Sequence, residues 1–173
     1  MEFFEVIEKR RAVRKYLPGK KIPIKDVNTI LETVSLAPSA RNLQSYKIFV
    51  AKTEDVINKI FQVYYNQRSD FIKNAALILI FCTDPVRAKE QFGERGEKLY
   101  SLQDATIAAS FALLTATALG YASCWVGNFA EGEMQKILGT KLRPVASIII
   151  GYADEYPERS PRKPLHSLAE FIS

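Results

Sequence analysis

Apolar positions along this chain follow two periods, and their alternation predicts helices and strands in turn. Apolar side chains that recur every three or four residues indicate helices, and uninterrupted apolar runs indicate strands that are buried on both faces. We therefore expect helices over about 2–11, 25–37, 55–65, 99–119 and 131–138, and strands over 46–52, 75–82, 122–127 and 145–153. Interleaved elements with both sheet faces covered predict a three-layer α/β or α+β domain.

The helix expected over 99–119 dominates this pattern because it carries no charged residue after Asp104. A helix that is uncharged around its whole circumference is typical of a core element. Its uncharged part comprises only about 15 residues, whereas about 20 are needed to span a bilayer. We therefore predict a buried core helix and no membrane span.

Both ends of the chain carry apolar residues that need burial. We expect the first helix to place four of them in the core, namely Phe3, Phe4, Val6 and Ile7. The tail after about 154 is rich in proline and polar residues, yet it contains Leu165, Leu168 and Phe171. Because such a tail cannot pack alone, we expect it to pack on a partner subunit.

Composition restricts the class of protein further. The chain has 173 residues, of which 47% are hydrophobic and 25% are charged, values that are typical of a soluble globular protein and predict a single domain over 1–173. Cys82 and Cys124 lie in apolar runs and are expected to be buried free thiols. The sequence has no CxxC or Cys/His cluster, so no metal site is expected. Because the N-terminal residues lack the order of a secretory signal, we expect a cytoplasmic protein.

Positive charge gathers at both ends of the chain, although the net charge is only +5. The first cluster consists of Lys9, Arg10, Arg11, Arg14, Lys15, Lys20, Lys21 and Lys25, and the second of Arg159, Arg162 and Lys163. Such clusters are usually solvated faces, and they also suit a phosphate-bearing partner, either nucleic acid or a nucleotide. A nucleic-acid-binding domain would add interleaved aromatic residues or a known motif. Neither is found, so we do not expect nucleic acid as a partner.

Side chains for acid–base or nucleophilic chemistry are scarce. His166 is the only histidine, and it lies in the tail, which leaves Ser–His and Cys–His schemes without a base. There is no P-loop, and no GxGxxG motif follows a strand. The remaining signals are basic side chains, amide side chains and a tryptophan close to a glycine, which are groups that bind a cofactor.

The stretch Ala37–Tyr46 (APSARNLQSY) is an unusually polar connector between a helix and a strand. It places the hydrogen-bonding side chains of Ser39, Arg41, Asn42 and Gln44 in one short turn, and none of them is acidic. A plain turn needs Gly, Pro or Asp, and it does not need three amide or guanidinium groups. The connector therefore indicates that a polar group is held there.

Four segments in this order along the chain resemble the FMN-dependent nitroreductase family. They are EKRRAVRKY (Glu8–Tyr16), APSARNLQSY (Ala37–Tyr46), QDATIAASFALLTATALGYASCWVGNF (Gln103–Phe129) and PRKPLHSL (Pro161–Leu168). The resemblance spans essentially the whole chain. It implies an α+β, three-layer α/β/α fold with a central mixed sheet, and a homodimer with two FMN sites at the subunit interface, each built from both chains.

The resemblance also assigns residues to the phosphate end of FMN. Arg10, Arg11 and Arg14 match the opening arginine motif, which meets the phosphate and the pyrimidine edge of the ring. Guanidinium groups suit a phosphate because they bind it in a bidentate manner. Ala12 stands where the family most often has serine, so one hydroxyl contact to the flavin is missing. The tail's basic pair, which closes on the phosphate, corresponds to Arg162 and Lys163.

The other matches surround the flavin ring. The turn that reaches the FMN of the other subunit corresponds to Pro38, Ser39, Ala40 and Asn42, with Gln44 in the same motif. The loop against the ring, where a backbone N–H faces flavin N5, corresponds to Cys124, Trp125, Val126, Gly127 and Asn128. Glycine at 127 permits close backbone approach, although some members have an acidic residue followed by glycine where this chain has Gly127-Asn128. Asn66 matches an amide contact ahead of the second strand.

The activity that the resemblance implies is an NAD(P)H-dependent flavin oxidoreductase. Tightly bound FMN would take hydride at N5 from NADH or NADPH and then reduce a nitroaromatic, quinone or similar acceptor, in a ping-pong mechanism. The protein would supply placement and positive field, so no catalytic side chain is expected. Two alternatives stay open, namely a specialised reductive enzyme of the same fold and an FMN carrier without turnover. The segment 86–98 is expected to be partly helical, mobile and part of the substrate gate.

Overall fold

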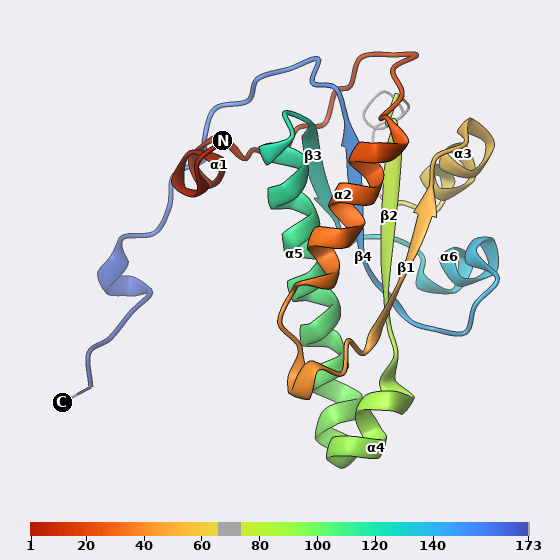
Figure 1. The fold of residues 1–173 in the computed structure, drawn as a ribbon, viewed down its shortest axis with the longest axis vertical. Helices are drawn as coiled ribbons and strands as arrows, with labels where there is room; N and C mark the ends of the chain where they lie inside the picture. Colours follow the sequence, from red (N-terminus) through yellow and green to blue (C-terminus); the bar gives the residue numbers. More distant parts are fainter. Residues whose placement is uncertain (66–73, 173) are drawn as a thin grey trace.

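The computed structural model describes residues 1–65 and 74–172, and it shows one sheet between helices (Figure 1). The elements in chain order are α1 (Phe3–Lys9), α2 (Ile24–Ser35), the 3-10 turn η1 (Ala40–Asn42), β1 (Tyr46–Ala51), α3 (Glu54–Gln62), β2 (Leu77–Thr83), α4 (Pro85–Arg95), the π-helical turn η2 (Gly96–Tyr100), α5 (Ser101–Ala118), β3 (Ala122–Val126), α6 (Glu131–Leu138), β4 (Pro144–Gly151) and the 3-10 turn η3 (Leu165–Ser167). Each expected helix and strand is present, with ends that differ by a few residues. The expected α+β class is confirmed.

The sheet has the strand order β1-β2-β4-β3, and each neighbouring pair is antiparallel. This corrects the expected mixed sheet: in the described part of the chain, parallel pairing is limited to the isolated bridge between Ala12 and Ser123. The reason is that an antiparallel sheet with helices on both faces has the same continuous apolar runs as a parallel one. The sequence pattern reports burial and not strand direction.

Helices cover both faces of the sheet, which confirms the three-layer arrangement. Leu79 and Phe81 of β2 pack with α2 and α5 on one face, whereas Ile78 and Ile80 pack with α3 and α6 on the other. Both clusters are possible because successive side chains of a strand point to opposite faces. The helix α5 lies close to the sheet through a row of small buried residues, Ala105, Ala108, Ala109, Ala112 and Ala116.

The segment after α1 is fixed to the C-terminal end of β4 by a buried tyrosine. Tyr16 donates its hydroxyl to the carbonyl of Val13 at 2.7 Å and forms a bridge with Ala153. Its ring lies against Gly151, where an added Cβ would come within 2.7 Å of the ring atom Cδ1. Glycine at this point in β4 therefore makes room for the ring that holds the arginine segment in place.

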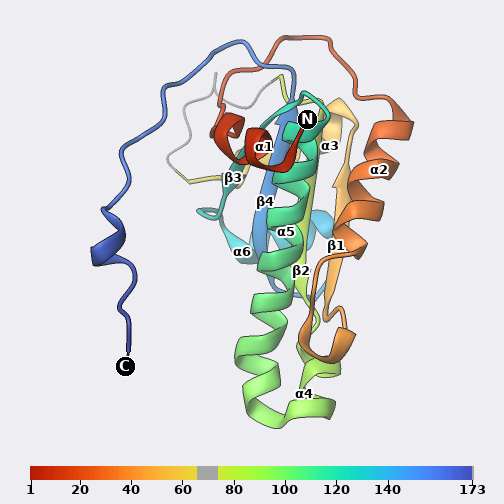
Figure 2. The same cartoon turned by 60° about the vertical axis from the view of Figure 1, so that its left-hand side comes forward.

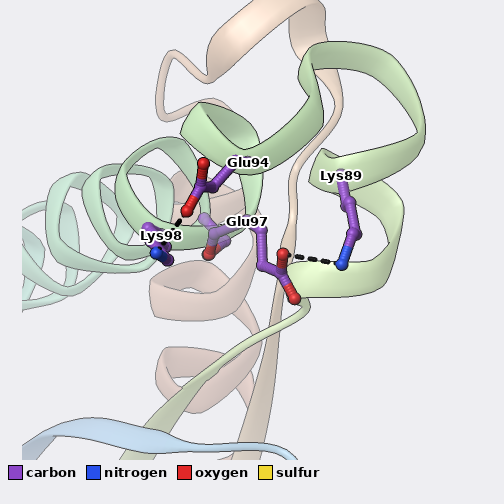
Figure 3. A network of polar contacts seen from close by, with 5 residues as sticks. Lys89, Glu94, Glu97 and Lys98 are labelled. Atoms are coloured by element: carbon purple, nitrogen blue, oxygen red, sulfur yellow. Dashed lines mark hydrogen bonds and ion pairs between the residues drawn. The ribbon is translucent and has the colours of Figure 1, made fainter.

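The polar segment between β2 and α5 forms a compact helical hairpin. Figure 3 shows two ion pairs across it, Lys89–Glu97 with 2.8 Å between Nζ and Oε2, and Lys98–Glu94. The helix α4 is broken at Gly93, whose φ of 61° and ψ of −147° suit glycine alone. The prediction that this segment is partly helical is confirmed, whereas its mobility and its role in a gate stay predictions.

The two chain ends lie away from the sheet. Figures 1 and 2 show the tail leaving β4, passing α1 and continuing outward. The expected burial of the first helix is wrong for a single chain, because Phe3, Phe4 and Ile7 are exposed and Val6 alone of the four is buried. The helix comprises only seven residues and buries Val6 alone.

Three sequence-level expectations concern cysteines, metals and membranes. Cys82 and Cys124 are buried free thiols, as expected. The residues that the structure describes contain no group of three His, Cys, Asp or Glu side chains able to hold a metal ion. Within residues 1–65 and 74–172, no helix combines the length and apolar character that a bilayer crossing requires.

Candidate functional site

The opening arginine motif lies where α1 ends and the chain turns along β3. Val13 donates its N–H to the carbonyl of Ser123 at 3.0 Å. This pairing brings Arg10 and Arg14 to the thiol of Cys124. Burial raises the pKa of Cys124, and the charges of Arg14 and, less strongly, Arg10 oppose that rise. Two of the predicted arginines therefore lie close to Cys124, the first residue of the loop that is predicted to lie against the flavin ring.

Guanidinium groups from both ends of the chain converge on Arg10. The pKa of Arg10 is lowered, first by burial and then by the positive charges of Arg162, Arg11 and Arg159. Arg159 is held there because its Nη2 donates to two main-chain carbonyls at the end of α1, at 3.0 and 2.6 Å. Like charges in a partly buried site repel one another, so this cluster favours a bound anion.

The predicted basic residues differ in where their side chains point. Arg11 turns back on α1 and donates Nη1 to main-chain carbonyls at the helix end, one of them that of Arg10 at 3.0 Å, which stabilises the end of the helix. Arg162 donates Nη1 to the carbonyl of Ser160 at 2.8 Å. Lys163 is exposed, and no contact in the described part of the tail joins it to the cluster.

A cavity of ≈ 660 Å³ lies beside Arg10, between α1, the C-terminal end of α5 and the start of the tail. Its wall includes Lys9, Arg11 and Ser123. The hydroxyl of Ser123 is buried and has no hydrogen-bond partner among the residues described. A buried polar group without a partner costs about 1–3 kcal/mol. This wall therefore offers a hydroxyl and positive charge to a polar ligand.

The loop predicted to lie against the flavin ring begins inside β3. Cys124 and Val126 are buried, Trp125 is half-buried, and Gly127 and Asn128 are exposed. A Cβ added to Gly127 would meet only the Trp125 ring, at 3.4 Å from Nε1, and Gly127 does not adopt a left-handed φ. Nothing in the protein itself requires glycine there, and its open side leaves room for a ligand.

The connector Ala37–Tyr46 has a strained backbone. Three residues other than glycine adopt a left-handed φ, namely Arg41 (50°), Asn42 (56°) and Gln44 (50°). This conformation costs an L-residue on the order of 1 kcal/mol. Such strain persists only where the surroundings fix it, and it collects at ligand sites. The exposed side chain of Asn42 makes no hydrogen bond to the described residues and remains available.

Gln44 has a role within the connector itself. Its Nε2 donates to the carbonyl of Ser35 at 3.0 Å, and its N–H donates to Oγ of Ser39 at 3.0 Å. The side chain of Gln44 therefore holds the connector against the end of α2, and is not directed to a ligand. Pro38 is exposed, and Ser39 and Ala40 are half-buried at the surface of the turn.

The connector and the arginine cluster lie near opposite ends of α5 (Figure 1). A second cavity, of ≈ 630 Å³, is lined by Pro38, Ser39 and Asp104 at the N-terminal end of this helix. The cavity beside the arginines includes Thr117 near the other end. Asp104 and Thr117 are about 20 Å apart along the helix axis. One chain therefore does not bring the two halves of the predicted site together.

Comparison with known proteins identifies the family. A model of the Nitroreductase family matches residues 7–67 and 62–152. The chain belongs to this family. Among nitroreductase-family relatives, an Archaeoglobus fulgidus protein assigned as an NADH dehydrogenase/NAD(P)H nitroreductase is 28% identical over 149 residues, 86% of this chain and 80% of that protein. The NADPH-flavin oxidoreductase of Vibrio harveyi is 27% identical over 94% of this chain and 70% of its own length.

Solved structures of the Nitroreductase family have the same fold. A protein of Exiguobacterium sibiricum, solved in complex with FMN, has a TM-score of 0.90 to this chain. The alignment covers 99% of this chain and 98% of that one at 20% identity. At this identity the likeness shows the fold, and the four-stranded sheet with its flanking helices is the nitroreductase fold.

Sequence reasoning does not single out three residues that the structure places beside the predicted site residues. Asp104 contacts the connector from α5, and its signal was available because it is the last charged residue before an uncharged helix. The sequence indicates Arg159 only as one member of the second basic cluster. Ser123 gives no signal in the sequence, since burial of a single hydroxyl depends on the fold. The predicted contact of Asn66 lies outside the described residues.

Proposed function

We propose that this protein is an FMN-dependent oxidoreductase that takes electrons from NADH or NADPH and reduces nitroaromatic, quinone or similar acceptors. The observation that carries the proposal is the positive cluster at the end of α1, where Arg159 is held by two main-chain carbonyls and Arg10 lies beside a cavity of ≈ 660 Å³. Family membership and the names of the two relatives support the same cofactor and co-substrate. We also infer one FMN-binding domain over 1–173, because both apolar clusters pack on a single sheet. A cytoplasmic location stays a prediction from the sequence.

The residues beside Arg10 fit the phosphate of FMN. A phosphate dianion is bound best by several guanidinium groups, which offer paired N–H donors in a fixed geometry. Partial burial of Arg10 strengthens this attraction because it reduces screening by water. The unpartnered hydroxyl of Ser123 in the cavity wall supplies a neutral donor. The phosphate is therefore assigned to the side of the fold where α1, β3 and the tail meet.

The loop after β3 suits the flavin ring. Gly127 leaves its open side to the ring, and the charge of Arg14, next to Cys124, favours the negative charge of a reduced flavin. From the connector, Ser39 and Asn42 offer neutral groups to the carbonyl and N–H edge. Bound FMN would supply hydride chemistry at N5, taking electrons from NAD(P)H and passing them to the acceptor. The protein itself would position the flavin and supply the positive charge around it.

We propose that the complete site requires two copies of the chain. One chain keeps the connector and the arginine cluster about 20 Å apart along α5. It also leaves large apolar side chains uncovered, among them Phe4 at 78% exposed on α1, and Leu165 at 81% and Phe171 at 100% in the tail. Exposed apolar surface of this kind marks an interface. A homodimer would cover these residues and join the connector of one chain to the arginines of its partner.

The proposal is tested by flavin titration and anaerobic reduction. The wild-type protein should bind FMN, and NADH or NADPH should then bleach the visible flavin band. Arg10→Ala should weaken FMN binding about ten- to hundredfold, since hydrogen bonds to charged groups contribute about 1.5–3 kcal/mol. The matched control is Arg87→Ala, an exposed arginine on α4, which should bind FMN as the wild type does.

Two outcomes would contradict the proposal in different ways. A protein that gains no colour or fluorescence change with added FMN is not a flavoprotein, and the arginine cluster then serves another anion. A protein that binds FMN but is reduced by neither NADH nor NADPH fits the FMN carrier without turnover. In the first case the cofactor assignment is wrong, and in the second only the reaction is.

A further inference from the structure

A buried carboxylate holds the connector from behind. Asp104 lies in the first turn of α5 and is only 2% exposed. Its Oδ1 accepts from the N–H of Ala40 at 3.0 Å. Its Oδ2 accepts from the N–H of Ser45 at 3.2 Å and from the Ser45 hydroxyl at 2.5 Å. The two oxygens of one carboxylate therefore reach both ends of the turn.

The turn that Asp104 spans is the strained part of the connector. Arg41, Asn42 and Gln44, all with left-handed φ, lie between its two anchor points at Ala40 and Ser45. A backbone of this kind needs outside contacts to stay in one conformation. Short-range bonds within the turn, such as the N–H of Asn42 to the carbonyl of Ser39 at 3.0 Å, close the loop but do not attach it to the fold. Gln44 attaches the turn to the end of α2, and Asp104 attaches both of its ends to α5.

We propose that Asp104 is the positioning residue of the flavin-binding turn, acting through the connector and not by contact with the flavin. Its three hydrogen bonds set the direction in which Ser39, Ala40 and Asn42 present their polar groups. The connector has no acid of its own, and the one that fixes it comes from a helix, which is more rigid than a loop. This inference rests on the proposed function, since it assigns the ligand of the turn as FMN.

The geometry calls for a carboxylate and not for an amide. Asp104 meets three donors, and a carboxylate accepts from all of them. In Asp104→Asn, the amide nitrogen would face either the N–H of Ala40 or the donors of Ser45, so one anchor point would be lost and repelled. Asp104→Asn has almost the same volume as the native side chain. It therefore changes the hydrogen bonds without opening a cavity.

The experiment measures FMN affinity in folded protein, together with the visible circular dichroism of the bound flavin and the melting temperature of the flavin-free protein. Asp104→Asn should raise the dissociation constant of FMN about tenfold or more and alter the dichroism of the flavin. Ser45→Ala removes one of the three bonds and should have a smaller effect in the same direction. Ser101→Ala is the matched control, because Ser101 is buried on the same helix but donates to Glu97 at 2.9 Å and not to the connector.

The readouts separate positioning from stability alone. A merely structural role would lower the melting temperature of Asp104→Asn and Ser101→Ala alike and leave FMN affinity and dichroism unchanged, which would overturn the inference. If Asp104→Asn does not fold, Ser45→Ala decides, since unchanged FMN affinity in that variant overturns it as well. Failure of the wild type to bind FMN would instead count against the proposed function.

Discussion

Single residues in this fold carry titrating groups whose behaviour follows from burial. Cys82 lies in β2 with no exposed surface, between the two strands on either side. Burial raises the pKa of its thiol from its ordinary value of 9.0 to about 12, and the charge of Lys47 opposes this only in part. A thiol that must stay neutral in the folded state makes stability depend on pH in the alkaline range.

We predict that the free energy of unfolding falls above pH 9 in part because of Cys82. Below pH 9 the thiol is protonated in both states, so its contribution is complete. Between pH 9 and about 12 the unfolded thiol ionises while the folded one does not, and stability falls by up to about 1.4 kcal/mol per pH unit. Urea unfolding of the wild type and Cys82→Ala at several pH values checks this. The stability of the two proteins should converge as pH rises, and curves that stay parallel above pH 9 would contradict it.

At the scale of elements, the hairpin of α4 and η2 depends on two glycines more than on its charges. Gly93 has a φ of 61° with a ψ of −147°, a region that other residues avoid. At Gly96 an added Cβ would lie 2.1 Å from the carbonyl oxygen of Ala88, which is backbone and cannot move aside cheaply. The ion pairs seen in Figure 3 are solvent-exposed and contribute little. Backbone geometry therefore fixes the hairpin.

We predict that Gly93→Ala lowers the free energy of unfolding by about 1–3 kcal/mol, the usual cost of such strain, and that Gly96→Ala also destabilises the protein. Gly132→Ala is the control, because Gly132 lies in α6 with open space around it and an ordinary φ. Alanine there should leave stability equal or raise it slightly. Chemical denaturation of the three variants tests this. Equal stability of Gly93→Ala and Gly132→Ala would show that the hairpin does not depend on the glycine backbone.

The elements also show how far sequence reasoning extends. Helix α6 was predicted over its exact bounds and β2 nearly so, because helical spacing and continuous apolar runs reflect burial directly. Strand direction was not predictable from burial, since both kinds of sheet bury the same runs. The same limit applies to the candidate site, where the sequence indicates residue types but not the contacts that they make. Charge and residue type indicate the arginines and the connector. The turn of Arg11 back onto α1 depends on local main-chain geometry, and the anchoring by Asp104 depends on hydrogen bonds made across the fold.

At the scale of the whole molecule, the decisive feature is the separation of the two halves of the site. Arg10 lies at the C-terminal end of α5 and the connector at its N-terminal end (Figure 1). If two chains pair so that one α5 runs opposite to the other, each arginine cluster meets the connector of the partner. Closed two-fold pairing makes two such sites at once. This arrangement makes a prediction that no single-chain site shares.

We predict that Arg10→Ala and Asn42→Ala restore each other when the two chains are combined in one dimer. Each variant alone damages both sites, whereas a mixed dimer has one site with both defects and one with neither. Random mixing makes about half of the dimers mixed, so the preparation should regain about a quarter of wild-type NAD(P)H oxidation with a quinone acceptor. Arg10→Ala mixed with Arg162→Ala is the control and should regain nothing, because these arginines meet within one chain. If the mixture of Arg10→Ala and Asn42→Ala stays inactive, each site belongs to one chain. The two halves of the site, which lie about 20 Å apart along α5 between Asp104 and Thr117, would then have to come together by a conformational change within that chain.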